Sequence, residues 1–153
     1  MNREGELQQR PSSTVVISQP RQADIRAGIE CALERASRQV LINVDKNSRI
    51  AIVYVTSRDQ TITEYVTGEL EYILVSNGFI LTDRSQLDRI RHEQNLQLSG
   101  EVDDATAVSI GRFVGADIIM TGVVDGEGAL RRLRLRALNT QTAQIVGVAS
   151  EHF

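Results

Sequence analysis

The chain has 153 residues, of which 41% are hydrophobic, and this length fits one domain that can bury a sizeable core. The formal net charge of −3 gives no overall attraction to nucleic acid or to anionic lipid. The single cysteine, Cys31, excludes an intrachain disulfide, and we expect it to be a small buried residue on a helix. No run approaches the roughly 20 apolar residues with which a helix spans a bilayer.

Residues 1–20 hold both prolines and show no helical pattern, which predicts an extended or flexible arm ahead of a single domain at residues 21–153. The β-branched run at 14–17 fits a short strand that docks on a sheet edge or on a partner. Residues 1–10 are too polar for a signal peptide. Two interpretations follow: the protein is cytoplasmic, or the chain starts after a removed signal and a lipid-bearing cysteine.

The pattern turns helical at residues 22–44, where apolar side chains recur every three or four positions. We expect this amphipathic helix to cover the sheet of its own domain, and a contact with a partner helix or a second subunit is the alternative. Residues 49–56 form a continuous apolar, β-branched run, which predicts a central strand. Residues 61–76 predict a second amphipathic helix.

The stretch at residues 79–124 predicts a strand, a helix, a linker, a second helix and a second strand. Residues 79–81 follow an Asn-Gly turn signal, and we expect them to form a short buried strand. Asp83 caps the first helix, whose apolar face is buried while its arginines, Arg91 among them, face water.

Asp103 or Asp104 caps the second helix of this stretch. Four side chains are expected to form its buried face: Ala107, Ile110, Phe113 and Val114. Gly115 is placed to end the helix in a left-handed conformation. The near-continuous apolar run at 116–124 then predicts a strand that is covered on both faces.

A turn at residues 125–128 precedes a segment in which apolar and charged side chains alternate. The alternation places Leu133, Leu135 and Ala137 on one face of a strand and three arginines on the other. After a second turn, residues 143–150 predict the last strand. The sequence therefore predicts an α/β (α+β) sandwich, in which amphipathic helices pack on a mixed sheet with a C-terminal antiparallel three-stranded meander.

No catalytic constellation is found in the sequence. His92 and His152 are isolated, with no Cys, His or carboxylate at a metal-ligand spacing. The glycines at 122–128 are followed by neither Lys-Ser/Thr nor a helix start, so they do not form a phosphate loop. No serine lies in a G-x-S-x-G elbow. We therefore predict no catalytic residue, no metal site and no cofactor, and a protein that is not an enzyme.

The strongest surface feature is a set of closely spaced arginines: Arg131, Arg132, Arg134 and Arg136. One interpretation is a solvated strand face whose charges keep a sheet edge from aggregating. The other is a docking patch for an acidic protein surface, an anionic glycan or nucleic acid. Nucleic acid is the weaker choice, because the whole chain is acidic and no aromatic residues interleave with the arginines.

The stretch at 79–124 also carries a resemblance. Its motifs are the aspartate-capped helix, Glu93-Gln94, Leu98-Ser99-Gly100, Ala107–Gly111, and a Gly115-Ala116-Asp117 turn into a strand that ends in Thr121-Gly122. In these motifs the chain resembles the CsgG/LpoB-like family of bacterial envelope proteins, and the resemblance covers roughly two thirds of the chain, from Arg49 to Asn139. That family includes the curli-secretion lipoprotein and the lipoprotein activators of penicillin-binding proteins.

The resemblance implies a non-enzymatic interaction domain on the periplasmic face of the outer membrane, usually lipid-anchored. The expected partner is another envelope protein, in regulation of a cell-wall synthase or in assembly of a secretion channel. The candidate partner-binding residues are Arg131, Arg132, Arg134, Arg136, Gln97, Ser99 and Glu101. Two alternatives are a structural module that forms homo-oligomers through the arm or the 22–44 helix and, with least support, an enzyme whose site is noncontiguous.

Overall fold

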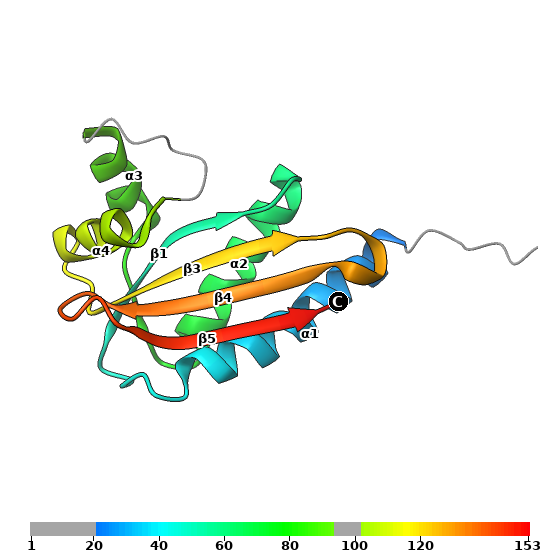
Figure 1. The fold of residues 1–153 in the computed structure, drawn as a ribbon, viewed down its shortest axis with the longest axis horizontal. Helices are drawn as coiled ribbons and strands as arrows, with labels where there is room; N and C mark the ends of the chain where they lie inside the picture. Colours follow the sequence, from blue (N-terminus) through cyan, green and yellow to red (C-terminus); the bar gives the residue numbers. More distant parts are fainter. Residues whose placement is uncertain (1–20, 94–101) are drawn as a thin grey trace, which may run out of the picture.

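A five-stranded sheet in the order β2-β1-β3-β4-β5 runs through the described part of this computed structural model, residues 21–93 and 102–153 (Figure 1). The strands are β1 (Arg49–Thr56), β2 (Ile80–Leu81), β3 (Ile118–Asp125), β4 (Arg132–Asn139) and β5 (Ile145–His152). β1 pairs in parallel with β2 and β3, whereas β3, β4 and β5 pair antiparallel. The predicted mixed sheet with a C-terminal antiparallel meander is confirmed.

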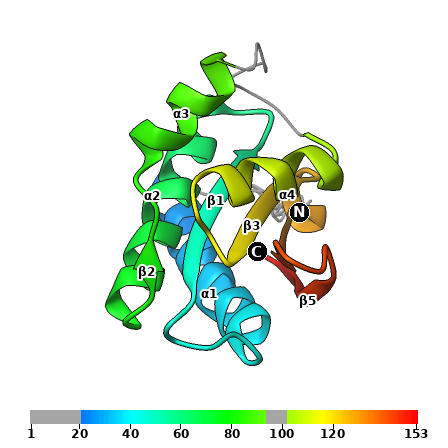
Figure 2. The ribbon, with the colours of Figure 1, turned by 90° about the vertical axis from the view of Figure 1, so that its left-hand side faces the viewer.

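Helices cover both faces of this sheet (Figure 2). α1 (Gln22–Leu41) and α2 (Gln60–Ser76) lie on one face, and α3 (Arg84–Glu93) and α4 (Asp104–Phe113) lie on the other. A short 3-10 turn, η1 (Gly128–Leu130), lies between β3 and β4. The predicted α/β sandwich is therefore confirmed, with the central strands β1 and β3 buried between two layers of helix.

Alternation along β1 and β3 explains why two apolar clusters form. In β1, Ile50, Ile52 and Val55 pack under α1 and α2, whereas Ala51 and Val53 pack under α3 and α4. A strand that is apolar at nearly every position can be stable only when both of its faces are covered. The predicted covering of both faces is confirmed for this pair of strands.

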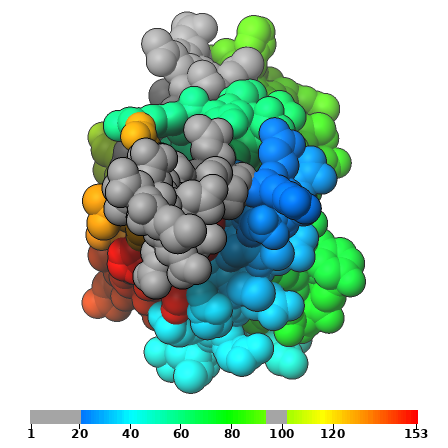
Figure 3. All heavy atoms as spheres, turned by 90° about the vertical axis from the view of Figure 1, so that its right-hand side faces the viewer, coloured from blue at the N-terminus to red at the C-terminus, as the bar shows by residue number. Residues whose placement is uncertain are grey.

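α1 lies against the β4–β5 side of the sheet, so its apolar stripe covers its own domain, as expected. Gly147 of β5 permits this close approach. A Cβ atom added to Gly147 would lie 2.3 Å from the Val40 carbonyl oxygen of α1, which is far inside contact distance. The start of α1 and the end of β5 lie at the same end of the molecule (Figure 1), where Gly28 faces Phe153. Figure 3 looks onto this end and shows the start of α1 in blue.

The helix ends follow the local sequence. The Asp103 carboxylate accepts a 2.7 Å hydrogen bond from the Thr106 amide, which caps α4. Gly115 has a φ of +72° and its amide donates to the Arg112 carbonyl, so the left-handed ending is confirmed. These two ends set the short length of α4.

Two expectations about buried apolar side chains are wrong. Phe113 is 69% exposed, because α4 touches the sheet at Gly111, where an added Cβ would lie 2.3 Å from Ile119, and Phe113 lies 200° further round the helix. Cys31 is exposed, because it lies 200° from Ile29, which faces the sheet. In both cases the side chain lies on the side of the helix that faces away from the sheet.

Two expectations about the region of β2 are also wrong. Ile80 is 51% exposed, because β2 pairs over only two residues and forms the edge of the sheet rather than a buried strand. Arg91 is 5% exposed, although we expected it to face water. Its guanidinium donates to the Val53 carbonyl, on the side of β1 that the short β2 leaves open.

Candidate partner-binding face

Three of the predicted site residues lie together on the outer face of β4. Leu133, Leu135 and Ala137 point toward α1 and are buried, whereas Arg132, Arg134 and Arg136 lie on the opposite face. The predicted alternation is confirmed. Within residues 21–93 and 102–153, α4 packs on β1 and β3 rather than on the outer face of β4 and β5, where Val148 of β5 is 59% exposed.

Asp125, the last residue of β3, holds two of the arginines. Its Oδ1 lies 3.3 Å from Arg132 Nε, and its Oδ2 lies 2.6 Å from Arg134 Nη2. The hydrogen bond from Arg132 and the charge of Arg134 hold the pKa of the Asp125 carboxyl below its ordinary value. Asp125 is therefore a carboxylate at neutral pH, and it fixes the direction of both guanidinium groups.

Asp104 holds the third arginine from a different element. Both nitrogens of the Arg136 fork donate 2.9 Å hydrogen bonds to the two Asp104 oxygens, a bidentate geometry that matches the planar guanidinium. Asp104 lies in the first turn of α4, where the helix dipole also favours its negative charge. This pair ties the sheet to the start of α4.

Arg131 is held differently from the other three. It precedes β4, and its guanidinium lies 5.6 Å from the centre of the Phe153 ring, an arrangement typical of a cation–π contact. The Phe153 amide also donates to the Arg131 carbonyl. Arg131 therefore contacts the C-terminal residue Phe153 and is not a member of the ion-paired group.

We name the ion-paired group the arginine face and define it by Arg132, Arg134, Arg136, Asp125 and Asp104. It holds three guanidinium groups and two carboxylates, so its excess is one positive charge rather than the three that the arginines alone indicate. Each arginine side chain remains 33–46% exposed. The face can therefore donate further hydrogen bonds to an acceptor that approaches from solvent.

Three predicted site residues, Gln97, Ser99 and Glu101, lie outside the described residues. Asp125 and Asp104 are members of the face that the sequence patterns do not predict, because these patterns place Asp125 in a turn and Asp104 at a helix cap. A signal existed for Asp125: a strand end followed by a turn places it opposite Arg132 in an antiparallel pair, as the register shows. No local signal pairs Asp104 with Arg136, which lies 32 residues later.

The described residues offer little for metal or membrane chemistry. They contain no group of three His, Cys, Asp or Glu side chains that could hold a metal ion. None of the helices in residues 21–93 and 102–153 is both long and apolar enough to cross a bilayer.

The chain matches one protein-family model over more than half of its length. Residues 34–126, more than half of the chain, match the family model described as "Curli production assembly/transport component CsgG". No curated protein matches the chain.

Solved structures share the fold at low sequence identity. The LpoB C-terminal domain from Salmonella enterica is 19% identical, with a TM-score of 0.68 over 85% of this chain and 98% of that one. The LpoB C-terminal domain from Escherichia coli is 19% identical, with a TM-score of 0.67 over 82% and 97%. The lipoprotein GNA1162 from Neisseria meningitidis is 12% identical, with a TM-score of 0.53 over 69% and 81%.

Proposed function

Because the chain belongs to the family of the curli production assembly/transport component CsgG, we propose that it is a non-enzymatic interaction domain of the bacterial cell envelope. The observation that carries this proposal is the arginine face. It is an open, charged sheet surface whose side chains are already held in place. The fold shared with LpoB domains and with a Neisseria lipoprotein supports the envelope setting.

The physical case rests on preorganisation. Asp125 and Asp104 hold the three arginines in fixed directions, so a partner need not order these long side chains on binding. The surplus positive charge favours an acidic protein surface, and Val148 adds an exposed apolar contact beside the arginines. Salt screens charged contacts at an exposed face, so the affinity of this interface should fall as the salt concentration rises.

The proposed partner is another envelope protein, either a cell-wall synthase that this domain regulates or a component of a secretion assembly. The proposed place of action is the periplasmic side of the outer membrane. We include Gln97, Ser99 and Glu101 in the proposed interface, because Asp104, which follows them by a few residues, pairs with Arg136 on the face.

Site-specific photo-crosslinking tests this proposal. A photoreactive residue at position 148, within the face, is compared in cells with one at position 38, an exposed position of α1 on the opposite side of the sheet. We expect one envelope protein to be captured from position 148 and not from position 38.

Charge reversal then tests the role of the arginines with that captured protein. Arg132→Glu combined with Arg134→Glu is expected to weaken binding by roughly tenfold or more, with a smaller salt dependence. Arg38→Glu is the matched control and is expected to bind normally. Equal binding by all three proteins, at every salt concentration, contradicts the proposal.

Self-association, through the 22–44 helix or through the N-terminal arm, is the second candidate. The apolar stripe of α1 is buried against β4 and β5, so this helix does not offer it to a second copy. Light scattering coupled to gel filtration, on the intact chain and on one that starts at Gln22, tests the route through residues 1–20. A defined oligomer that dissociates on truncation would support self-assembly.

A further inference from the structure

The open edge of β1 points to a second binding site, independent of the arginine face. β2 pairs with β1 only at Arg49 and Ile50, and the Thr82 amide adds a last hydrogen bond to the Ile50 carbonyl. β1 continues to Thr56. Within residues 21–93 and 102–153, no strand pairs with this second part of β1 on the β2 side.

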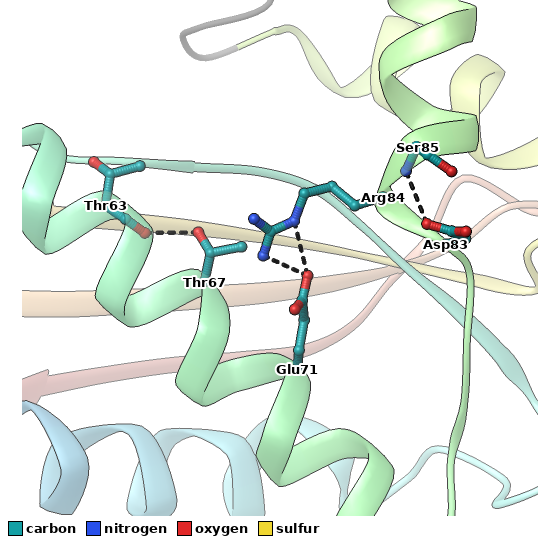
Figure 4. Close-up of polar contacts among 6 residues, drawn as sticks. All are labelled: Thr63, Thr67, Glu71, Asp83, Arg84 and Ser85. Atoms are coloured by element: carbon teal, nitrogen blue, oxygen red, sulfur yellow. Dashed lines mark hydrogen bonds and ion pairs between the residues drawn. The ribbon is translucent and has the colours of Figure 1, made fainter.

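A groove of about 370 Å³ runs along this edge. Its base is the consecutive run of residues 52–57, which means that the backbone of β1, and not only alternate side chains, lines it. α2 forms one wall with Thr63 and Thr67, and α3 forms the other. The Arg84–Glu71 ion pair, at 2.6 Å, bridges the two helices across the groove (Figure 4).

The backbone groups on this edge can be assigned from two contacts. The Val53 carbonyl faces the groove, because it accepts a hydrogen bond from Arg91 of α3, which lines the same groove. Successive residues of a strand direct their backbone groups to alternate sides. The Ile50 and Val53 carbonyls both face the β2 side, because the register shift between Ile52 and Tyr54 interrupts this alternation. Beyond the shift, Tyr54 and Thr56 therefore face β3. The amide and carbonyl of Val55 face the groove.

Arg91 supplies a hydrogen-bond donor to the backbone on this edge of β1. A buried strand edge needs donors and acceptors for its backbone groups, and an inward-pointing charged side chain also prevents unwanted strand pairing. Arg91 serves Val53 in this way. Beyond Val53 the groove continues past Val55 toward Ser57, and no strand within residues 21–93 and 102–153 occupies this length.

The charges along the groove indicate what kind of strand fits. Its lining includes three carboxylates, Glu64, Glu71 and Asp88, against two guanidinium groups, Arg84 and Arg91. Glu71 is neutralised by Arg84. Glu64 and Asp88 are exposed and lie on opposite walls, α2 and α3. The excess of one negative charge favours a ligand with a basic side chain.

We propose that this groove binds an extended peptide segment of a partner protein, which adds a strand beside Val55 and places a lysine or arginine between Glu64 and Asp88. Main-chain hydrogen bonds to an exposed strand edge supply affinity in such complexes, and the flanking pockets select side chains. The hydroxyl groups of Thr63 and Thr67 provide a polar wall beside the added strand. This site goes beyond the proposed function and does not depend on it.

Selection from a random peptide library displayed on phage, against the full chain, tests the proposal. The selected peptides are expected to alternate β-branched residues with lysine or arginine. On binding, amide NMR shifts should change at residues 52–57 and on the facing sides of α2 and α3. The same peptide with its alternate backbone amides N-methylated should lose binding by roughly tenfold or more, because strand addition depends on those amides.

Variants separate the groove from other surfaces. Thr67→Arg fills the groove and is expected to abolish peptide binding, and Asp88→Lys, at an exposed position, should weaken it and reduce the preference for a basic residue. Thr142→Arg, in an exposed turn, is the matched control. The Arg132→Glu/Arg134→Glu protein should bind the peptides normally, so failure of this proposal and failure of the proposed function are distinguishable.

Two results would overturn the proposal. One is selected peptides whose shifts map to the arginine face, or whose binding is unaffected by N-methylation and by both groove variants. The other is a synthetic peptide of residues 10–19 that binds the groove more tightly than any selected peptide, because the occupant would then be a segment of this chain.

Discussion

Arg136 of β4 and Asp104 of α4 form two parallel hydrogen bonds, each 2.9 Å long, between residues 32 positions apart in the sequence. The pair joins the outer face of the sheet to the first turn of a helix whose N-terminus Asp103 also caps. The position of α4 is thus coupled to the arginine face. A ligand that engages Arg136 would act directly on the start of α4.

A double-mutant cycle of Arg136→Lys and Asp104→Asn should show a coupling energy of about 0.2–1 kcal/mol, because the pair is partly exposed and screened by water. Urea unfolding of the four proteins measures it. The Arg58–Glu127 pair is the control, since its side chains are 82% and 81% exposed, and we expect no measurable coupling there. Equal coupling in the two cycles would show that the bidentate geometry contributes nothing.

Gly147→Ala should destabilise the fold by about 1–3 kcal/mol, since the added methyl group would meet the backbone of α1 at Val40 and the helix would have to move. Gly68→Ala, within α2, is the matched control. It meets nothing within 4 Å and should stabilise the protein by roughly 0.5–1 kcal/mol through helix propensity. Chemical unfolding measures both, and the expectation fails if the two substitutions change the unfolding free energy in the same direction.

The lowered pKa of Asp125 predicts a contribution to acid sensitivity. A carboxyl group whose folded pKa lies below its unfolded value stabilises the fold above the unfolded pKa, near 3.8, and loses this contribution as the pH falls through the folded value. Asp125→Asn should therefore show a smaller loss of unfolding free energy than the parent between about pH 5 and about pH 2. The difference should be small, because water screens this exposed group. If the unfolding free energies of the parent and of Asp125→Asn depend on pH in the same way, the Asp125 pKa is not lowered in the folded protein.

The Tyr65 hydroxyl should lose its proton at a higher pH than an ordinary tyrosine does. A hydrogen bond to the Glu30 carboxylate is the main cause that raises its pKa from 10.0 to about 12. Since the folded pKa lies above the unfolded one, this contribution to stability is complete below pH 10.0 and is lost as the pH rises toward about 12. Tyrosinate absorbance, with Tyr65→Phe subtracted, measures the titration. Glu30→Gln should lower the pKa, and Glu34→Gln, one turn further along α1, should leave it unchanged.

Arg91→Met should destabilise the protein by about 1–3 kcal/mol, because it removes the donor to the Val53 carbonyl while it keeps most of the buried side-chain volume. Arg89→Met, at an exposed position of the same helix, should lie within about 0.5 kcal/mol of the parent. Thermal and urea unfolding compare them. If both variants are equally stable, the hydrogen bond to β1 contributes nothing to the fold.

Several features of the fold could be predicted from the sequence, because their causes are local. The β-branched run of β1, the alternation of β4, the cap at Asp103 and the left-handed Gly115 all depend on residues within a few positions of one another. The family resemblance drew on the same local motifs, and residues 34–126 match the CsgG family model.

The wrong expectations share one physical origin, which is contact between segments far apart in the chain. Phe113 faces water because Gly111 meets Ile119 and Thr140, and no helical periodicity encodes that contact. Arg91 is buried because β2 is too short to serve Val53. A pattern reports which side chains share a face of an element, but it cannot report how far the neighbouring element extends.

The type and order of the elements, the mixed sheet and the position of three arginines on one face of β4 all follow from patterns in the amino-acid sequence. Two other features emerge from the folded chain: aspartates from β3 and α4 neutralise most of that charge, and no described strand covers the second part of the β1 edge between α2 and α3. The reason is that periodicity along the chain follows from local backbone geometry, whereas ion pairs across elements and open edges depend on the packing of the whole sheet.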